Sequence, residues 1–230
     1  MTTLSASDAR DLVRKNLDEL DPNGSIMYND ENGSTNAYGD NRSLDEIIFR
    51  CLPEAINAVH MAAPVTLLEG ESASPANVSI SDKVLSFDIG SGSKYLRLVA
   101  FRAKDSDIVV TDTIPEASPE GRKQLNAAIR GRKDRPRLVL LQDGESDPSF
   151  KYYTTDETTT GTAVELFKYV KEQTYRANTV SDGVTTYTSY NISRPLRQNI
   201  IDCCTAMVME TFGDQRAQSF YSKANSFQSI

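Results

Sequence analysis

The spacing of apolar residues changes twice along the chain. Apolar positions recur every three or four residues near both ends, and every second residue through much of the middle. The first spacing is typical of helices with one buried face, and the second of strands. The pattern predicts an α+β fold in which the terminal helices form a small helical bundle and a β-rich region is inserted between them. We expect residues 1–72 and 193–230 to build the bundle and residues 73–192 to form the inserted domain.

Two helices separated by a long polar loop are predicted for the N-terminal part. Ser5 or Ser7 is the candidate N-cap of the first helix, which ends at a strong turn signal. Residues 21–42 then form a polar loop, and loops of this length are usually functional or disordered. A capping box at Ser43 opens the second helix. Because proline lacks a backbone N–H, we expect Pro53 to kink or break this helix.

The middle of the chain is predicted to contain short strands and hairpins. A probable hairpin joins residues 137–141 to 150–153 around an Asp-Gly pair, and Asp182-Gly183 is another plausible hairpin turn. Residues 163–172 fit both a strand and a helix, and a strand is favoured because a β-region surrounds them. The earlier strands are predicted at residues 78–80, 84–89, 95–101 and 108–110.

Helical spacing returns near the C-terminus. Ser193 and Pro195 have the residue types of an N-cap and a first turn, and Gly213 those of a helix end. A short final helix follows in residues 214–227. These helices are expected to complete the bundle started by the N-terminal pair.

Composition bears on whether the protein is exported, spans a membrane or contains disulfides. The 230 residues carry a formal net charge of −7, and no stretch approaches the ~20 apolar residues of a membrane span. The N-terminus becomes a charged amphipathic helix, so we expect no export signal and no membrane partner. Three cysteines, two of them adjacent, cannot form a disulfide framework and are interpreted as buried reduced thiols.

Signatures of catalysis are sparse. The only histidine, His60, is interpreted as a helix-end residue that favours the helix dipole, and a multi-histidine metal site within one chain is excluded. The glycines of Gly90 to Lys94 are too close together for a phosphate-binding P-loop, so a hairpin turn is favoured. The polar loop 21–42 fails the calcium pattern of an EF-hand. We therefore predict no catalytic residue, no cofactor and no metal site, and expect the protein not to be an enzyme.

One segment is strongly basic in this acidic chain. Residues 120–137 hold seven of the 25 lysines and arginines. We expect a short helix, capped by Ser118 and ending at Gly131, with Leu125, Ala128 and Ile129 on its buried side. The basic residues would then lie on the exposed helix face and the following turn. They are Arg122, Lys123, Arg130, Arg132, Lys133, Arg135 and Arg137.

Three interpretations of the basic segment remain open. A protein interface is favoured, in which the cations meet acidic surfaces of a neighbouring copy such as the loop 21–42. A solvated turn is the second. Nucleic-acid binding is the third, and it is weakened because residues 118–137 contain no aromatic side chain and the acidic chain as a whole would repel phosphate.

Three stretches together resemble a known family of virion proteins. They are LDEIIFRCLPEAINAVHMAAPVTLLEG (44–70), SPEGRKQLNAAIRGRKDRPRLVLL (118–141) and ISRPLRQNIIDCCTAMVMETFGDQRAQSFYSKANSF (192–227). They resemble, by pattern, the head-tail connector (adaptor or ring) proteins of short-tailed, crAss-like bacteriophages of gut bacteria. The β-rich insertion departs from the smallest members of that family.

The resemblance implies a structural role in the virion. It implies copies assembled in a ring, usually of twelve, that dock on the portal protein, contact other tail or ring proteins, and let DNA pass through the channel without sequence-specific binding. It also implies assembly in the host cytoplasm and location at the portal vertex of the virion. The alternatives are a DNA-contacting packaging accessory that acts through residues 122–137 and, less favoured, a metal-dependent hydrolase.

Overall fold

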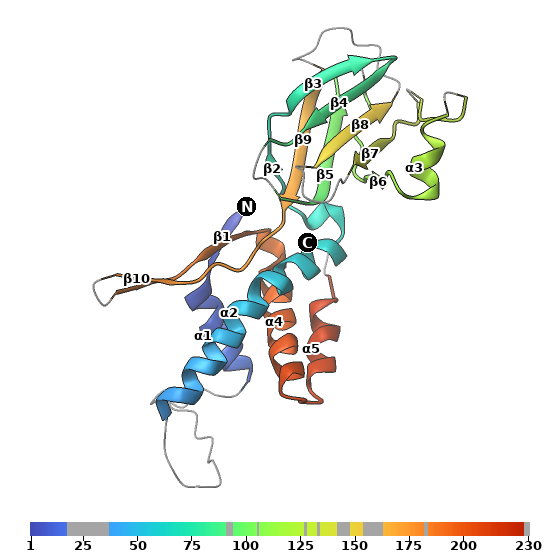
Figure 1. The fold of residues 1–230 in the computed structure, drawn as a ribbon. Coiled ribbons are helices and arrows are strands. Elements are labelled where there is room, and N and C mark those ends of the chain that lie inside the picture. Colours follow the sequence, from blue (N-terminus) through green and yellow to red (C-terminus); the bar gives the residue numbers. More distant parts are fainter. Residues whose placement is uncertain are drawn as a thin grey trace. The chain divides into compact units, whose positions relative to one another are not determined.

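The computed structural model is an α+β protein whose chain divides into two compact units (Figure 1). The helical unit consists of Met1–Leu67 and Gln173–Ile230, and the β unit of Leu68–Glu172. The expected plan, helices at both termini and a β-rich region between them, is confirmed. The structure describes residues 1–17, 37–90, 94–104, 106–126, 128–132, 134–141, 148–153, 163–181 and 184–227.

The boundaries between the units differ from the expected ones. The expected insertion extends to residue 192, yet residues 173–192 belong to the helical unit. The reason is a strand pair, in which β12 (Ser189–Ile192) runs antiparallel to β1 (Thr2–Ser5). Leu4 and Ile192 are both buried in this pair. The N-terminal strand thus ties the segment before the last helices back to the bundle.

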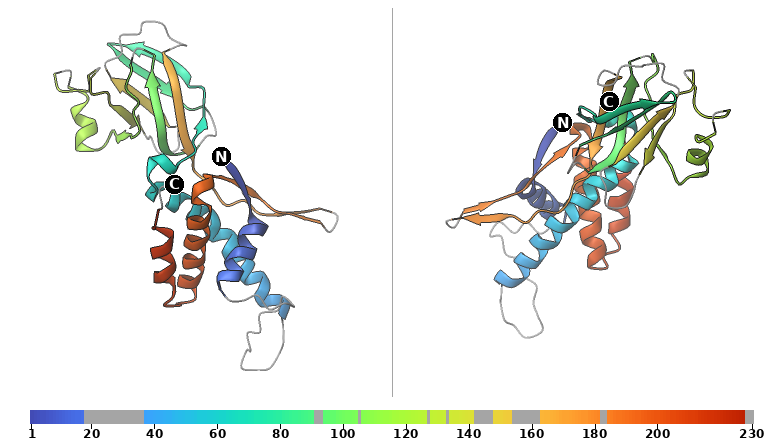
Figure 2. Two further views of the ribbon diagram at one scale, coloured as in Figure 1. Left: turned by 180° about the vertical axis from the view of Figure 1, so that it is seen from behind. Right: turned by 45° about the horizontal axis from the view of Figure 1, so that its top comes forward.

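The helical unit has four described α-helices, and α4 packs against the other three (Figure 2). They are α1 (Ala6–Asn16), α2 (Ala37–Ala62), α4 (Arg197–Thr211) and α5 (Ala217–Ala224). Helix α4 contacts each of the other three. Its side chains are accordingly buried on nearly every side, from Ile200 to Met209, as expected of a helix enclosed by others.

The start of α1 was predicted correctly, whereas that of α2 was not. Ser5 is the N-cap of α1, and its Oγ accepts a hydrogen bond from the amide of Ser7 at 3.2 Å. Helix α2 begins at Ala37, so residues 37–42 of the expected polar loop are helical and Ser43 is not a cap. The remainder of that loop, up to residue 36, lies outside the described residues.

Of the two outcomes expected at Pro53, a kink or a break in α2, the break is wrong. The helix is continuous through it to Ala62. Proline removes the amide that would bond to the carbonyl of Phe49. The helix nevertheless buries Leu52 and Ile56 on either side of this position, and burial of such side chains contributes about 1.5–3 kcal/mol each.

The last helices match their predicted positions closely. A 3-10 turn, η2 (Arg194–Leu196), precedes α4, and Ser193 stands at its N-cap position without a side-chain cap bond. Gly213, with a φ of 70°, follows the helix in the left-handed region that glycine favours. Another 3-10 turn, η1 (Val65–Leu67), follows α2.

The β unit consists of two sheets packed face to face (Figures 1 and 2). The first has the order β3 (Ala76–Ser81), β4 (Val84–Asp88), β8 (Ser149–Tyr153), β7 (Leu138–Leu141) and β6 (Ile114–Pro115). The second has the order β2 (Glu71–Ser72), β9 (Val164–Lys171) and β5 (Tyr95–Ala103). The strand favoured at 163–172 and the hairpin of 137–141 with 150–153 are confirmed. The expected strand at 108–110 is wrong, since only Val110 forms a bridge, to Phe101.

Aromatic side chains fill the space between the two sheets. Phe87 from β4 stacks on Phe101 from β5 with ring centroids 5.4 Å apart, and it meets the edge of Phe167 from β9 at 5.3 Å. Tyr152 and Phe150 from β8 are buried in the same cluster. Because these contacts join strands from both sheets, the β unit has its own hydrophobic core.

The chain enters and leaves the β unit along neighbouring strands. Strand β2 pairs with β9, so Glu71 lies opposite Tyr169. In the helical unit, Asn57 holds the departing chain at Gln173 with reciprocal hydrogen bonds of 2.8 Å between its side-chain amide and the Gln173 backbone. The predicted hairpin then follows as β10 (Thr179–Ser181) and β11 (Val184–Thr186), a two-stranded arm seen in Figures 1 and 2.

Candidate interaction surface

The basic segment begins with a short, well-defined helix in the β unit. Helix α3 (Pro119–Lys123) has Ser118 as its N-cap, and the Oγ of Ser118 accepts a hydrogen bond from the amide of Gly121 at 3.0 Å. Gly121 is buried against the strand before it, where a Cβ would lie 2.3 Å from the carbonyl oxygen of Pro115. The cap was predicted, and the close approach explains why position 121 requires glycine.

Helix α3 ends at Lys123, eight positions before the expected end at Gly131. The side-chain oxygen of Asn126 accepts from the amide of Ala128, a local bond that competes with helix formation. The buried side chain of Gln124 then spans the turn, since its Oε1 accepts from the amide of Gly131 at 2.7 Å and its Nε2 donates to the Glu120 carbonyl at 3.3 Å. These bonds fold the chain back on itself before β7.

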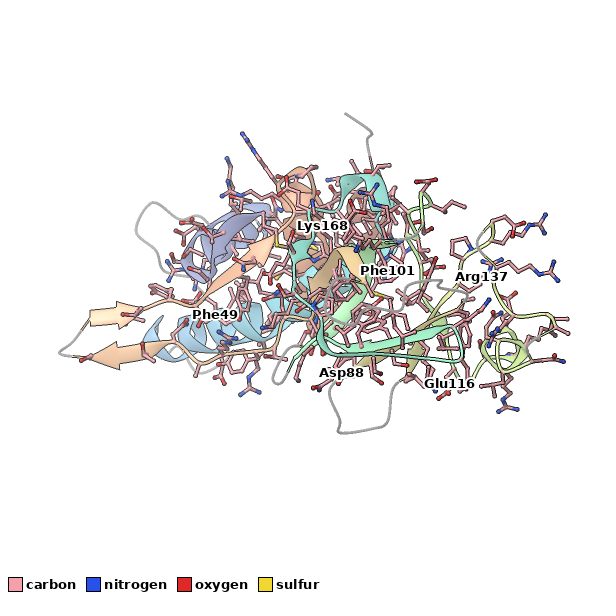
Figure 3. All side chains as sticks on the ribbon, turned by 90° about the horizontal axis from the view of Figure 1, so that it is seen from above. Phe49, Asp88, Phe101, Glu116, Arg137 and Lys168 are labelled. Carbon is pink, nitrogen blue, oxygen red and sulfur yellow. The ribbon has the colours of Figure 1, made fainter. Side chains whose placement is uncertain are left out.

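The folded-back chain gathers most of the basic residues around one cleft of about 650 Å³, which we call the basic cleft. Arg132 and Arg135 face each other across a tight turn closed by two backbone hydrogen bonds of 2.8 and 3.2 Å. Figure 3 shows Arg137 at the edge of the β unit among outward-pointing basic side chains, and Phe101 in the interior. The cations that line the cleft are Lys123, Arg130, Arg132, Arg135 and Arg137.

The other two predicted basic residues are Arg122 and Lys133. Arg122 is exposed on α3 and is not among the lining residues. Lys133 lies outside the described residues. The structure thus brings together five of the predicted basic residues.

The predicted buried face of the segment is exposed instead. Leu125 is 66% and Ile129 58% exposed, and Ala128 is exposed as well. The prediction extended a helical period beyond Lys123, where no helix continues. As a result, Ile129 lines the basic cleft, and its exposed side chain adds apolar area to the positive charge there.

The cleft has an excess of positive charge. Among the described residues, its five cations face two carboxylates, Glu120 and Asp134. Arg130 is half-buried and donates to the carbonyl of Asp82 at 3.2 Å, which fixes its position. Lys123, Arg132, Arg135 and Arg137 are exposed, and no described residue forms an ion pair with them. Like charges held together this way repel one another until a partner supplies negative charge.

His60 and two of the three cysteines are buried in the helical unit. The ring of His60 is buried, and its Nε2 accepts a hydrogen bond from the amide of Ser193 at 3.3 Å. His60 lies in the last turn of α2, the helix-end position expected of it, and burial lowers the pKa of its ring to about 4, so the ring is neutral at pH 7. Cys203 and Cys204 are buried and reduced as predicted, and burial raises the pKa of Cys203 to about 11. Cys51 is half-buried.

Two further properties concern the described residues only. Among them, no group of three or more histidine, cysteine or carboxylate side chains is arranged to hold a metal ion. In the same part of the chain, no helix has the length and apolar content needed to cross a bilayer. Residues 91–93 of the predicted hairpin turn and residues 21–36 of the predicted polar loop lie outside the described residues.

Sequence reasoning missed one exposed apolar pair. Ile108 and Val109, expected in a strand, are 41% and 43% exposed. Their apolar character is the same as that of a buried strand, and nothing in the local pattern distinguishes the two cases.

Comparison of the chain with models of known protein families and with curated protein sequences finds no match.

Proposed function

We propose that this protein is a structural virion protein, a ring-forming head-tail connector or adaptor that docks on the portal and extends the DNA channel toward the tail. The observation that carries the proposal is the basic cleft, with four exposed cations that lack an ion pair with any described residue and with Ile129 exposed beside them. A surface of this kind suits a partner of complementary charge. The kind of assembly, a connector ring, is suggested by the resemblance of residues 44–70, 118–141 and 192–227 to connector proteins.

A ring accounts for the charge distribution. A cationic cleft cannot bind an identical cleft on a second copy, so a contact between copies must join two different patches. Such heterologous contacts close into a ring when the rotation between copies permits. The net charge of −7 supplies acidic surface on each copy, and it also suits a channel that DNA crosses without adhering.

Reconstitution on the portal tests the proposal. The protein is mixed with the purified portal of the same virus and examined by light scattering and electron microscopy. We expect a ring of one uniform copy number on the portal. Arg132→Glu/Arg135→Glu/Arg137→Glu should prevent the ring, whereas reversal of three exposed lysines outside the cleft, Lys15, Lys83 and Lys94, should not. Portal and protein that never associate would refute the connector role.

DNA contact is the second candidate function, because exposed arginines also suit phosphate. A packaging accessory that uses residues 122–137 would shift the mobility of DNA in a gel, and the shift would weaken steeply with salt. Binding that is absent at low salt would remove this candidate.

A further inference from the structure

Two segments of the described β unit carry strongly exposed large apolar side chains. Among its described residues, the large hydrophobic side chains that are strongly exposed are Ile108, Val109, Leu125 and Ile129. The last two belong to the basic segment, and the first two lie on a separate stretch with the opposite charge. Exposed apolar side chains that are grouped in this way mark interaction surfaces more often than isolated ones do.

The second segment, residues 107–112, is named here the acidic ledge. Asp107 and Asp112 are exposed at its ends, with Ile108 and Val109 between them. The ledge is held in place from both sides. The buried Ser106 accepts a hydrogen bond from the amide of Ile108 at 3.2 Å, and Val110 exchanges two backbone hydrogen bonds of 2.8 Å with Phe101 in β5.

The ledge and the cleft have complementary chemistry. The ledge presents two carboxylates around an apolar pair, and the cleft presents cations around Ile129. The carboxylates would supply the negative charge that Arg132, Arg135 and Arg137 lack. The aliphatic side chains would bury one another, and the apolar area that this removes from water would favour the contact.

We propose that the acidic ledge of one copy of this chain docks into the basic cleft of the next copy. The two patches differ, so each copy offers one cleft and one ledge, and the contact repeats from copy to copy. This inference deepens the proposed ring-forming function and rests on it for closure of the ring, while the contact itself is defined by the two patches alone.

A charge exchange between the patches tests the contact. The cleft-reversed variant is Arg132→Glu/Arg135→Glu/Arg137→Glu, and the ledge-reversed variant is Asp107→Lys/Asp112→Lys. Self-association of the wild-type protein and of each variant is measured by sedimentation velocity, up to the highest soluble concentration. We expect wild-type self-association to weaken with added salt, and each variant alone to associate at least ~10-fold more weakly.

An equimolar mixture of the two variants decides the question. In the mixture, acidic clefts meet basic ledges and basic clefts meet acidic ledges, so association should return to within ~3-fold of the wild-type strength. A mixture that associates no better than the separate variants overturns the proposal. So does a cleft-reversed variant that associates like the wild type, or a wild-type protein that stays monomeric throughout.

Two sets of controls are needed, one for loss of folding in the variants and one for ligands other than the ledge that could occupy the cleft. Circular dichroism and thermal unfolding establish that the variants are folded, and if a charge variant is not, Ile108→Ser and Ile129→Ser test the same contact with charges unchanged. Labelled DNA and a labelled peptide of residues 17–37 serve as alternative ligands. Binding of either one to the cleft, without rescue in the mixture, overturns the ledge as occupant.

The two experiments fail in different ways. The mixture experiment contains no portal, so loss of rescue overturns the ledge-to-cleft contact and leaves portal docking to its own test. Conversely, rescue in the mixture without ring formation on the portal preserves the contact and overturns the connector role.

Discussion

His60 illustrates how the surroundings of one residue set its chemistry. Its ring lies buried between α2 and the segment before α4, and it accepts a hydrogen bond from Ser193 through Nε2. An accepting Nε2 places the proton of the neutral ring on Nδ1. Protonation would convert the accepting nitrogen into a donor that points at another donor. The native helical unit therefore favours the neutral ring.

This environment predicts a loss of stability in mild acid. The pKa of His60 falls from its ordinary 6.5 to about 4 in the native protein. Below pH 6.5 the histidine of the unfolded chain binds a proton, whereas that of the native chain stays neutral down to about pH 4. The free energy of unfolding therefore decreases as the pH falls towards 4, by at most about 3 kcal/mol. Urea unfolding at several pH values across this range measures the decrease.

His60→Gln provides the matched control, because a glutamine oxygen can accept from Ser193 but does not titrate. Carboxylates titrate in both proteins, so the difference between the two pH profiles isolates the imidazole. If wild type and His60→Gln lose stability in parallel, the histidine is not responsible.

Single residues also show where sequence reasoning succeeds and where it stops. The caps at Ser5 and Ser118 were predictable because the serine hydroxyl acts on amides two or three positions away. The exposure of Ile129 was not, because it depends on the bond between Gln124 and Gly131, which local periodicity does not encode. The basic residues were recognised from charge alone, but which of them share a cleft was decided by that fold-back.

At the scale of elements, an ion pair joins α1 to α2. Arg14 donates to Oδ1 of Asp45 through Nη2 at 2.6 Å and through Nε at 2.9 Å. The two side chains are only 12% and 25% exposed, so water weakens this pair less than it weakens surface pairs. On α2 itself, Arg50 and Glu46 form a pair that is more than half exposed on both sides.

The two pairs should differ in their contribution to stability. We expect Asp45→Asn to lower the free energy of unfolding by about 1–2 kcal/mol, because the charged arginine keeps its partly buried position without a carboxylate. Glu46→Gln should change it by less than ~0.5 kcal/mol. Chemical unfolding of both variants in one buffer makes the comparison, and equal effects would contradict it.

Helices and strands differ in how well local sequence patterns predict them. Strand β4 alternates between partly buried and buried residues, β5 is an apolar run of nine residues, and α4 has a clear apolar pattern followed by Gly213, so all three can be recognised. Strand β1 has four residues, and its partner β12 lies near the other end of the chain. Pairing at such separation leaves no local signal, so the segment 173–192 was placed with the wrong unit.

At the scale of the whole molecule, the β unit is a self-contained insertion. Its core joins two sheets through aromatic contacts, and its first and last strands, β2 and β9, lie side by side. Chain ends that meet at paired strands allow a segment to be excised without stretching either part.

We therefore expect residues 68–172 to fold when expressed alone. The fragment should show β-type circular dichroism and one cooperative unfolding transition, because it retains its entire core. Replacing the same residues in the full chain by a short Gly/Ser linker between Leu67 and Gln173 should leave the helical content of the remaining unit intact. A fragment without dispersed amide resonances in solution NMR would show that the insertion depends on the helices.

The discontinuous helical unit has a consequence for synthesis on the ribosome. Helices α1 and α2 emerge first, yet α4, the helix against which both of them pack, is translated only after the whole β unit. The β unit, having all its strands by Lys171, can fold during translation. The nascent N-terminal helices must meanwhile keep apolar stripes uncovered, which makes this interval the period when the chain most needs a chaperone.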